Sequence, residues 1–539
     1  MMFVESVAVN SEPYELNILK VGLSLIIFFV PFFQYIQFAG SWKAKAQWLS
    51  PPRVPLFGSL PFFTCADLSQ QFSNWKEKYG STFLLKLGTS DEILVITGFE
   101  MAREVLLING TSFSIEKPSM FNDELELKEY FSTSRSTALN TYQTRRQLIH
   151  QITKMMLQFK RRDYIDRASC NLITHIQEQL TISPKEPINI KASITRAVAL
   201  VSVNLGFGLR WSTQDLLSKQ EGRRIIRAIE IIFSKFQTSD IPTLVFQSLA
   251  DLLPEGMMRQ KEQATEVTEE LLQSHRSIWR LARDTLEKGD KDTLEPSIVQ
   301  VLLTDEKYKT LSEFEMYCLT VTTIASAFSS IVYTLHTALR CAAALPDWQQ
   351  KLQVEIDRYL VAMAGKKETH FLQEYGKGGT TKKMPLLGAF LDEVLRLFPP
   401  IKFLTRTAIR DVPLSDGKTI REGQRTVIAL QNLNRDPILF KNPDEFDPYR
   451  FLTGGKLNET KAMWPKYGHT TFGGGRQVCP GADMARYQVM YFLSRLIEKF
   501  EFKMHNSQSG LQYLKGPQSG GSAFPDFSSI IITGRRHND

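Results

Sequence analysis

A glycine-rich loop that ends in a single cysteine constrains this sequence more than any other feature. Residues 472–481 read FGGGRQVCPG, and a run of helix-forming composition, 482–497, follows directly. Glycines allow tight turns and a close backbone approach to a flat partner. Because Cys479 stands just before a helix N-terminus, it meets the positive end of the helix dipole and backbone N–H donors. This position favours the thiolate, which is the form that binds metal.

The other cysteines limit which metal Cys479 can bind. The chain has five scattered cysteines, Cys65, Cys170, Cys318, Cys341 and Cys479. Cys479 has no CxxC partner, which argues against a tetrahedral zinc site. Haem iron needs one axial protein ligand, so a lone thiolate suits it. The odd, scattered set of cysteines predicts no disulfide framework and indicates a reducing compartment.

Length and charge limit the class of protein. The chain has 539 residues, of which 43% are hydrophobic and 23% charged, as in ordinary globular proteins with a large core. The net charge is +8, but the 65 Lys and Arg residues are dispersed without a long basic run. This pattern disfavours nucleic-acid binding. It favours an anionic membrane surface or an acidic partner protein.

Residues 18–38 are strongly apolar, with Lys20 as the one charge. About 20 helical residues span a bilayer core of ~30 Å. Acidic residues precede the segment and basic residues follow it: Glu5, Glu12 and Glu15, then Lys43, Lys45 and Arg53. By the positive-inside rule, the bulk of the chain is cytoplasmic. A buried core helix and a cleaved signal peptide are the alternatives. The acidic start and the lack of a small-residue cleavage site disfavour the signal peptide.

The segment after the apolar stretch is rich in proline, at 51–58. Prolines stiffen the chain and orient the domain attached to it. We therefore divide the chain into a short lumenal tail (1–17), a transmembrane anchor (18–38), a basic and proline-rich hinge (39–60) and one large domain (61–539).

Local patterns predict a mainly helical domain with a minor sheet. Two strands, 82–87 and 93–97, are joined through a turn at 88–91. Residues 312–345 contain neither Gly nor Pro, and their nearly uncharged centre predicts a long buried helix. The other predicted elements are a helix at 347–360, a strand at 426–430, surface insertions at 365–383 and 454–461, and a closing hairpin around 520–533.

A second motif, Glu393-Val-Leu-Arg396, places two opposite charges on one helix face. Most such pairs are surface bridges of small worth. Here apolar residues surround the pair, so a third partner is expected. Arg450, in the segment FDPYRF at 446–451, is the candidate.

These motifs occur in the order found in microsomal cytochromes P450, and the chain resembles that family over nearly its whole length. It is also similar to members of fungal secondary metabolism. The loop matches the family pattern Phe-x-x-Gly-x-Arg-x-Cys-x-Gly at Phe472, Gly475, Cys479 and Gly481, whereas Gln477 replaces the Arg. The resemblance implies the P450 fold, mainly α with minor β, as a single haem domain behind an N-terminal transmembrane helix.

The resemblance also implies roles for residues outside the loop. Cys479 would be the axial ligand of the haem iron, and Glu393, Arg396 and Arg450 would form the structural triad. The haem propionates would be bound by Arg406 and by Tyr142 and Arg146, which match the family's Trp-x-x-x-Arg with Tyr for Trp. Gln477 can donate a hydrogen bond there but has no charge.

The central helix departs from the family. The usual Ala-Gly-x-Asp/Glu-Thr, which routes protons to dioxygen, corresponds to residues 326–330. Ser330 replaces the Thr, Ser329 stands at the acid position and Ala327 replaces the Gly. Serines and ordered water can relay protons and support normal oxygenation. Alternatively, the protein is an isomerase or dehydratase that acts without dioxygen. A purely structural interpretation is that small residues let the helix pass close to the macrocycle.

The resemblance implies a monooxygenase that contains haem b and receives electrons from NADPH through a flavoprotein reductase, with cytochrome b5 as a further partner. Its substrate would be a hydrophobic small molecule, such as a terpenoid, polyketide or alkaloid. The expected site is the endoplasmic reticulum membrane, with no nucleic-acid partner. Candidate pocket residues are Ala327, Phe328, Ile401, Phe403 and Phe524. A non-enzymatic haem binder is a further alternative.

Overall fold

The structure is a computed structural model of the chain. It describes residues 47–54, 58–64, 68–87, 91–115, 146–152, 163–182, 190–226, 276–288, 297–363, 383–452, 467–505 and 530–534. The predicted anchor at 18–38 and most of the two predicted insertions therefore lie outside the described residues.

The described chain is mainly helical. Its α-helices are α2 (Leu68–Tyr79), α3 (Phe99–Arg103), α6 (Asp163–Ile182), α7 (Ile190–Phe207), α8 (Thr213–Ser218), α12 (Ile298–Thr304), α13 (Glu313–Ala344), α14 (Pro346–Met363), α15 (Pro385–Leu397), α16 (Leu430–Leu433) and α17 (Ala482–Lys499). Short 3-10 helices are η1 (Leu60–Phe62), η3 (Gly110–Ser112), η7 (Glu306–Tyr308), η10 (Pro448–Phe451) and η13 (Gly475–Gln477), and η2 (Glu104–Ile108) is a π-helix. Residues 146–152, 220–226 and 276–287 are also helical.

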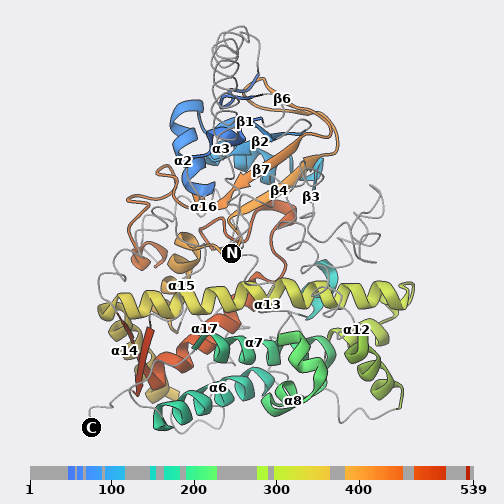
Figure 1. The fold of residues 1–539 in the computed structure, drawn as a ribbon, viewed down its shortest axis with the longest axis vertical. Helices are drawn as coiled ribbons and strands as arrows, with labels where there is room; N and C mark the ends of the chain where they lie inside the picture. The colour runs from blue at the N-terminus through green and yellow to red at the C-terminus, as the bar shows by residue number, and fades with distance from the viewer. Residues whose placement is uncertain are drawn as a thin grey trace, which may run out of the picture.

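A five-stranded sheet occupies one end of the molecule, drawn at the top of Figure 1. Its order is β1 (Thr82–Leu87), β2 (Asp91–Ile96), β7 (Arg425–Ala429), β4 (Phe403–Ala408) and β3 (Phe113–Ile115). Alternate side chains of a strand face opposite sides. Ile93 and Val95 accordingly pack in one apolar cluster with Phe72 of α2, while Leu94 and Ile96 pack in another.

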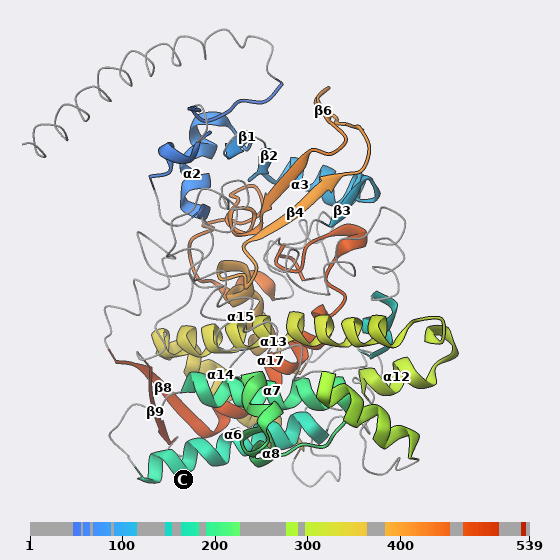
Figure 2. The same cartoon turned by 45° about the vertical axis from the view of Figure 1, so that its right-hand side comes forward.

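The long helix α13 lies between the sheet and the helical part of the molecule, in both Figure 1 and Figure 2. Ser312 caps its N-terminus and forms a capping box with Glu315. From Ile331 to Ala343 every residue is buried. The largest apolar cluster joins α13 to α6, α7, α14, α15 and α17. This core fixes α13, α15 and α17 relative to one another.

The structure confirms the main sequence predictions of the fold. β1 and β2 form an antiparallel pair, and α13 spans the predicted 312–345 helix to within one residue at each end. The predicted closing hairpin differs in detail, because β9 (Ile530–Gly534) pairs with β8 (Phe500–Met504). A separate two-stranded pair joins β5 (Val412–Pro413) to β6 (Thr419–Ile420).

Within the described residues, α7 is the one helix that is long and apolar enough to cross a membrane. Of its 18 residues, 83% are buried inside the protein. Its burial and its contacts with α6 and α13 identify it as a core helix.

Candidate functional site

The cysteine loop is closed by its own backbone. The Cys479 N–H donates to the Phe472 carbonyl at 2.8 Å, and the Gly473 N–H donates to the Thr470 carbonyl at 2.7 Å. Cys479 is exposed, and Gly481 is the N-cap of α17. The thiol is thus presented immediately before the N-terminus of an 18-residue helix, where negative charge is stabilised.

Gly475 explains why the loop needs glycine. Its φ is +63°, a left-handed conformation that side-chain-bearing residues rarely adopt. A Cβ added there would lie 2.0 Å from the Leu106 carbonyl oxygen in the π-helix η2. The absence of a side chain therefore lets the loop pack directly on the η2 backbone. By contrast, a Cβ on Gly481 would meet no atom within 4 Å.

Two side chains attach the loop to neighbouring elements. Arg146, at the start of the 146–152 helix, donates from Nη1 to the Arg476 carbonyl and, at 3.3 Å, to the Val478 carbonyl. Gln477 donates from Nε2 to the Phe113 carbonyl on β3 at 2.8 Å. Sequence reasoning assigned both side chains to the haem propionates. In this structure they bind backbone carbonyls and brace the loop.

The structure brings Glu393, Arg396 and Arg450 together. Arg396 donates to both carboxylate oxygens of Glu393, at 2.7 and 2.8 Å, and both side chains are fully buried. Arg450 donates from Nε to Glu393 at 3.2 Å, and the Asp447 N–H donates to the same oxygen at 2.7 Å. The paired buried charges thus satisfy one another and join α15 to η10.

Asn434 connects this triad to the cysteine loop. Its carbonyl accepts from Nη1 of Arg396 at 2.8 Å. Its side-chain oxygen accepts from the Thr470 N–H at 2.8 Å, and its amide donates to the Thr471 hydroxyl at 2.9 Å. The Thr471 hydroxyl in turn donates to the Leu395 carbonyl at 2.7 Å. α15 and the beginning of the loop are therefore held through one buried, hydrogen-bonded residue that sequence reasoning missed.

A second group of buried polar residues, around Asp392 and Arg486, was not predicted from the sequence either. Asp392, the neighbour of Glu393, forms an ion pair with Arg486 on α17, and both residues are at least nine-tenths buried. The Arg486 guanidinium lies 4.4 Å from the centre of the Tyr467 ring. The signal in the sequence is two adjacent acids within the apolar helix 385–397, because each buried carboxylate needs its own cation.

His469 is fully buried beside this ion pair, with Nε2 3.4 Å from Oδ1 of Asp392. Burial, with a further contribution from the positive charge of Arg396, lowers the pKa of His469 to about 3. The imidazole is therefore neutral at physiological pH, and it packs as an aromatic ring against Tyr467 and Phe472.

The remaining predicted cofactor residues are divided between the sheet and undescribed segments. Arg406 lies on β4, is 4% exposed and donates from Nη1 to the Thr405 carbonyl at 2.7 Å. It is paired in register with Ile115 of β3, two residues from the Phe113 carbonyl that binds Gln477. Tyr142 lies outside the described residues.

On α13, Ser329 and Ser330 are half-buried within an uninterrupted α-helix. The Thr334 hydroxyl donates to the Ser330 carbonyl at 2.7 Å. Thr320 and Thr323 donate in the same way to carbonyls four residues earlier, at 2.9 and 2.7 Å. Such bonds within a helix can bend it locally.

The candidate pocket residues are not gathered in one place. Phe328 is buried in the main apolar cluster, and Ala327 packs against that cluster. Phe403 belongs to the apolar cluster under α2, where its ring lies 5.5 Å from that of Phe72. Ile401 is 50% exposed. Phe524 lies outside the described residues.

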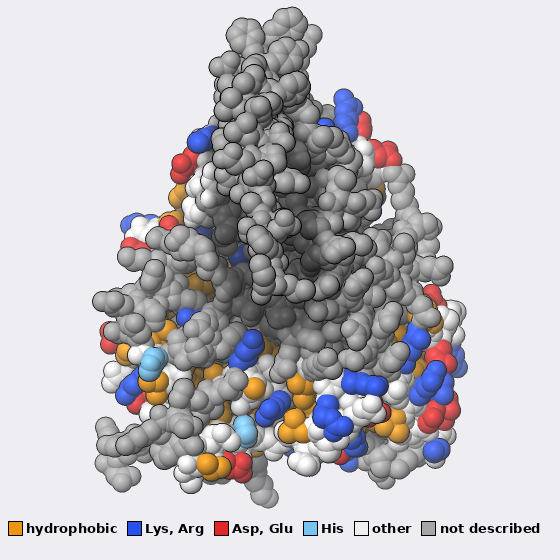
Figure 3. All heavy atoms as spheres, viewed as in Figure 1, with side chains coloured by type: hydrophobic (Ala, Val, Ile, Leu, Met, Phe, Trp, Pro, Cys, Tyr) orange, Lys and Arg blue, Asp and Glu red, His pale blue; other side chains and the backbone are white. Residues whose placement is uncertain are grey.

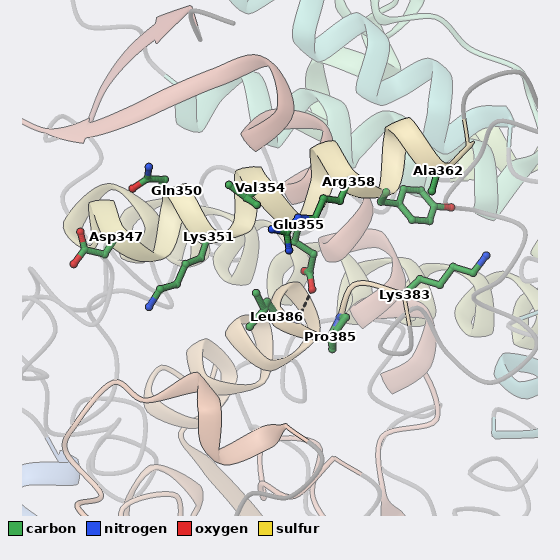
Figure 4. Close-up of a pocket in the computed structure, with 11 residues that line it drawn as sticks. Asp347, Gln350, Lys351, Val354, Glu355, Arg358, Ala362, Lys383, Pro385 and Leu386 are labelled. Carbon is green, nitrogen blue, oxygen red and sulfur yellow. Dashed lines mark hydrogen bonds between the residues drawn. The ribbon is translucent and has the colours of Figure 1, made fainter. Parts of the chain in front are cut away.

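A cavity of about 880 Å³ lies between α14 and α15 (Figure 4). It is lined by Asp347, Gln350, Lys351, Val354, Glu355, Arg358, Tyr359, Ala362, Lys383, Pro385 and Leu386. Glu355 accepts the N–H groups of Leu386 and Leu387, both at 2.8 Å, and so caps α15. Burial raises the pKa of this carboxyl. None of the lining residues belongs to the cysteine loop, so this cavity is separate from the cysteine site.

One face of the molecule is shown in Figure 3, where basic, acidic and apolar side chains are mixed over the described helical part. This mixture agrees with the dispersed charge of the sequence. It gives no sign of a continuous basic surface among the side chains drawn there.

The family model for cytochrome P450 matches residues 49–521. The chain is 26% identical to a steroid 17-alpha-hydroxylase/17,20 lyase of Oryzias latipes, over 85% of this chain and 86% of the relative. It is 24% identical to a norfluorocurarine oxidase from Strychnos, over 89% and 91% of the two chains, and 24% identical to a melianol synthase of Ailanthus altissima, over 92% of each. The chain therefore belongs to the cytochrome P450 family, a family of monooxygenases that use haem and electrons supplied by NADPH through a reductase.

Proposed function

We propose that Cys479 is the thiolate ligand of the haem iron and that the protein oxidises a hydrophobic small molecule of secondary metabolism. The observation that carries this proposal is the closed loop, which presents one exposed thiol at the N-terminus of α17. Haem supplies dioxygen activation when bound, and an axial thiolate favours cleavage of the O–O bond.

The residues around the loop fit this cofactor. A lone thiol satisfies the single axial position of haem iron and could not complete a tetrahedral zinc site. A Cβ added at Gly481 would meet no atom within 4 Å, so no described neighbour packs against this end of the loop. The buried guanidinium of Arg406, together with Arg146 and Tyr142, would supply charge and hydrogen bonds to the haem carboxylates. Gln477 would add a neutral donor.

Ser329 and Ser330 of α13 would lie on the path of proton transfer. The Ser330 hydroxyl can donate and accept a hydrogen bond, so it can pass a proton along a chain that includes water. Ser329 stands where relatives usually have an acid, and it cannot itself release a proton near neutral pH. In this proposal proton delivery depends on the Ser330 hydroxyl and on water.

The relatives support the substrate class. One is named as a steroid hydroxylase and lyase, one as an oxidase of norfluorocurarine and one as a melianol synthase. We therefore favour a steroid-like, terpenoid or alkaloid skeleton, with Ala327, Phe328, Ile401, Phe403 and Phe524 as candidate contacts. The 18–38 segment would anchor the protein in the endoplasmic reticulum membrane, with its haem domain exposed to a flavoprotein reductase and to cytochrome b5.

A second candidate function follows from the serine at position 329. A P450-fold isomerase or dehydratase needs no proton delivery to dioxygen, and therefore no acid at this position. Such an enzyme would convert its substrate without reductase, NADPH or dioxygen.

One experiment separates the two functions. The full-length protein, in membranes with reductase, is incubated with extracts of the source organism under isotopically labelled dioxygen. The monooxygenase predicts a product that carries one labelled oxygen atom and appears only with NADPH. A product that forms equally without NADPH and without label would contradict the oxygenase and support the isomerase.

A further inference from the structure

Two adjacent carboxylates of α15 serve different partners. Glu393 binds Arg396 and Arg450, which belong to α15 and η10. Asp392 binds Arg486, which lies on α17 one turn beyond the N-terminus that follows Cys479. The first pair joins segments that precede the loop. The second pair attaches the helix that follows it.

Arg486 and Asp483 of α17 both contact Tyr467, which lies five residues before the loop. The guanidinium of Arg486 lies over the Tyr467 ring, 4.4 Å from its centre. The Tyr467 hydroxyl donates to Asp483. Because residues 483 and 486 share one face of a helix, both contacts act on the first turns of α17. Tyr467 therefore ties the beginning of the loop to the helix at its end.

The same tyrosine starts a stack of rings that leads to the loop itself. The rings of Tyr467 and His469 are 6.3 Å apart and nearly parallel, and His469 lies 5.7 Å from Phe472. The Phe472 carbonyl accepts the N–H of Cys479. The ion pair, the stack and the backbone bond thus form a continuous path from Asp392 to the backbone of Cys479.

We propose that Asp392, Arg486 and Tyr467 form a brace that positions the Cys479 thiolate against the haem iron. The proposal rests on Cys479 being the iron ligand. The three are positioning residues, since they act on Cys479 through α17 and the loop. Outer contacts of this kind orient metal ligands, and their removal usually weakens metal binding by ~10–100-fold.

The test replaces Asp392 with Asn, which keeps the shape of the side chain and removes its charge. The matched control is Glu498→Gln at the other end of α17, which removes a carboxylate paired with Arg495 at 2.9 Å and Lys499 at 2.7 Å. Three quantities are measured on the full-length haem-loaded protein: the rate of haem loss, the reduction potential, and the fraction of reduced protein with the carbon monoxide band of thiolate ligation.

We expect Asp392→Asn to release haem about 10-fold faster, to lower the thiolate-ligated fraction and to shift the reduction potential. Glu498→Gln should leave all three near the wild-type values. The proposal is wrong if the two variants behave alike, or if Asp392→Asn lowers only the unfolding temperature. A purely structural ion pair would not move the reduction potential.

Tyr467→Phe keeps the test decisive if Asp392→Asn fails to fold. It removes only the hydroxyl that binds Asp483 and keeps the ring under Arg486. A shifted reduction potential in a fully folded protein supports the brace, and an unchanged potential and haem-loss rate overturn it. If the wild-type protein lacks the thiolate band, the ligand assignment fails. If the wild type has the band and neither variant changes it, only the brace fails.

Discussion

The cysteine loop and the centre of α13 pack against the same apolar core, through Phe472 and Ala327 respectively, yet they are held differently. The loop and the residues just before it are fixed by contacts with distant parts of the chain, including Arg146, Phe113 and Asn434. The described hydroxyl bonds of α13 instead run to carbonyls four residues earlier in the same helix.

This difference predicts different effects of substitutions in the two regions. Long-range contacts make the loop geometry depend on the whole fold, so changes there should affect haem binding and stability. Ser329 and Ser330 are half-buried and precede the fully buried stretch of α13 at 331–343, so their hydroxyls should be replaceable without loss of the fold. We therefore expect substitutions of Ser329 and Ser330 to change the reaction. Substitutions around the loop should lower haem binding and stability.

The largest effect is expected for Glu393→Ala. It leaves the buried Arg396 and the half-buried Arg450 without their carboxylate, and breaking a buried ion pair in this way costs about 3–5 kcal/mol. Expression should give misfolded protein without haem, measured as the haem-to-protein ratio after purification. Asp444→Asn is the control, because that acid is 75% exposed in its pair with Arg435. Equal haem content in the two variants would contradict the triad's structural role.

Gly475→Ala should have the next largest effect. The added Cβ would meet the Leu106 carbonyl oxygen at 2.0 Å, and the backbone has φ +63°. The loop or η2 must shift, so we expect a loss of at least about 2 kcal/mol in the free energy of unfolding. Gly417→Ala is the matched control, because it has φ +80° and open space around the new Cβ. Similar losses would show that the contact with η2 is unimportant.

Ser330→Ala should leave the fold intact and reduce the coupling of oxygenation. If the Ser330 hydroxyl relays protons, the product formed per NADPH consumed should fall about tenfold. Thr323→Ala removes a buried hydroxyl from the same helix and should leave this ratio near wild type. An unchanged ratio in Ser330→Ala would mean that water alone carries the protons, or that the reaction uses no dioxygen.

The smallest effect is expected for Gln477→Ala. It removes one hydrogen bond to the Phe113 carbonyl, which is worth about 1 kcal/mol of stability. Thermal unfolding of the haem-loaded protein measures this loss. Gln424→Ala, which removes an amide bound to the Glu92 carbonyl at the sheet, is the comparison. A stability above wild type for Gln477→Ala would contradict its role in bracing the loop.

Much of the fold followed from local sequence patterns. The run without Gly or Pro predicted α13, and Ser312 with Glu315 provides the cap that starts it. The pair Glu393 and Arg396 could be predicted because its members are three residues apart on one helix. Partners from distant segments could not be predicted this way. Asp392 could pair with any buried cation, and only tertiary packing brings Arg486 to it.

Gln477 illustrates the same limit within the loop. Gln477 is predicted from the sequence to donate to the haem propionates, and its contact with the carbonyl of Phe113 on β3 was not predicted. The proximity of β3 depends on its pairing with β4, which comes almost 300 residues later in the chain. No local pattern encodes that pairing.

The most direct test of the central claim is the carbon monoxide difference spectrum of the reduced protein and of two Cys479 variants. The wild type should show the haem-thiolate band at about 450 nm. Cys479→Ala and Cys479→His should lose that band even where the His variant retains haem. A wild-type spectrum without the band, or a Cys479→Ala spectrum that keeps it, would contradict the assignment of Cys479 as the iron ligand.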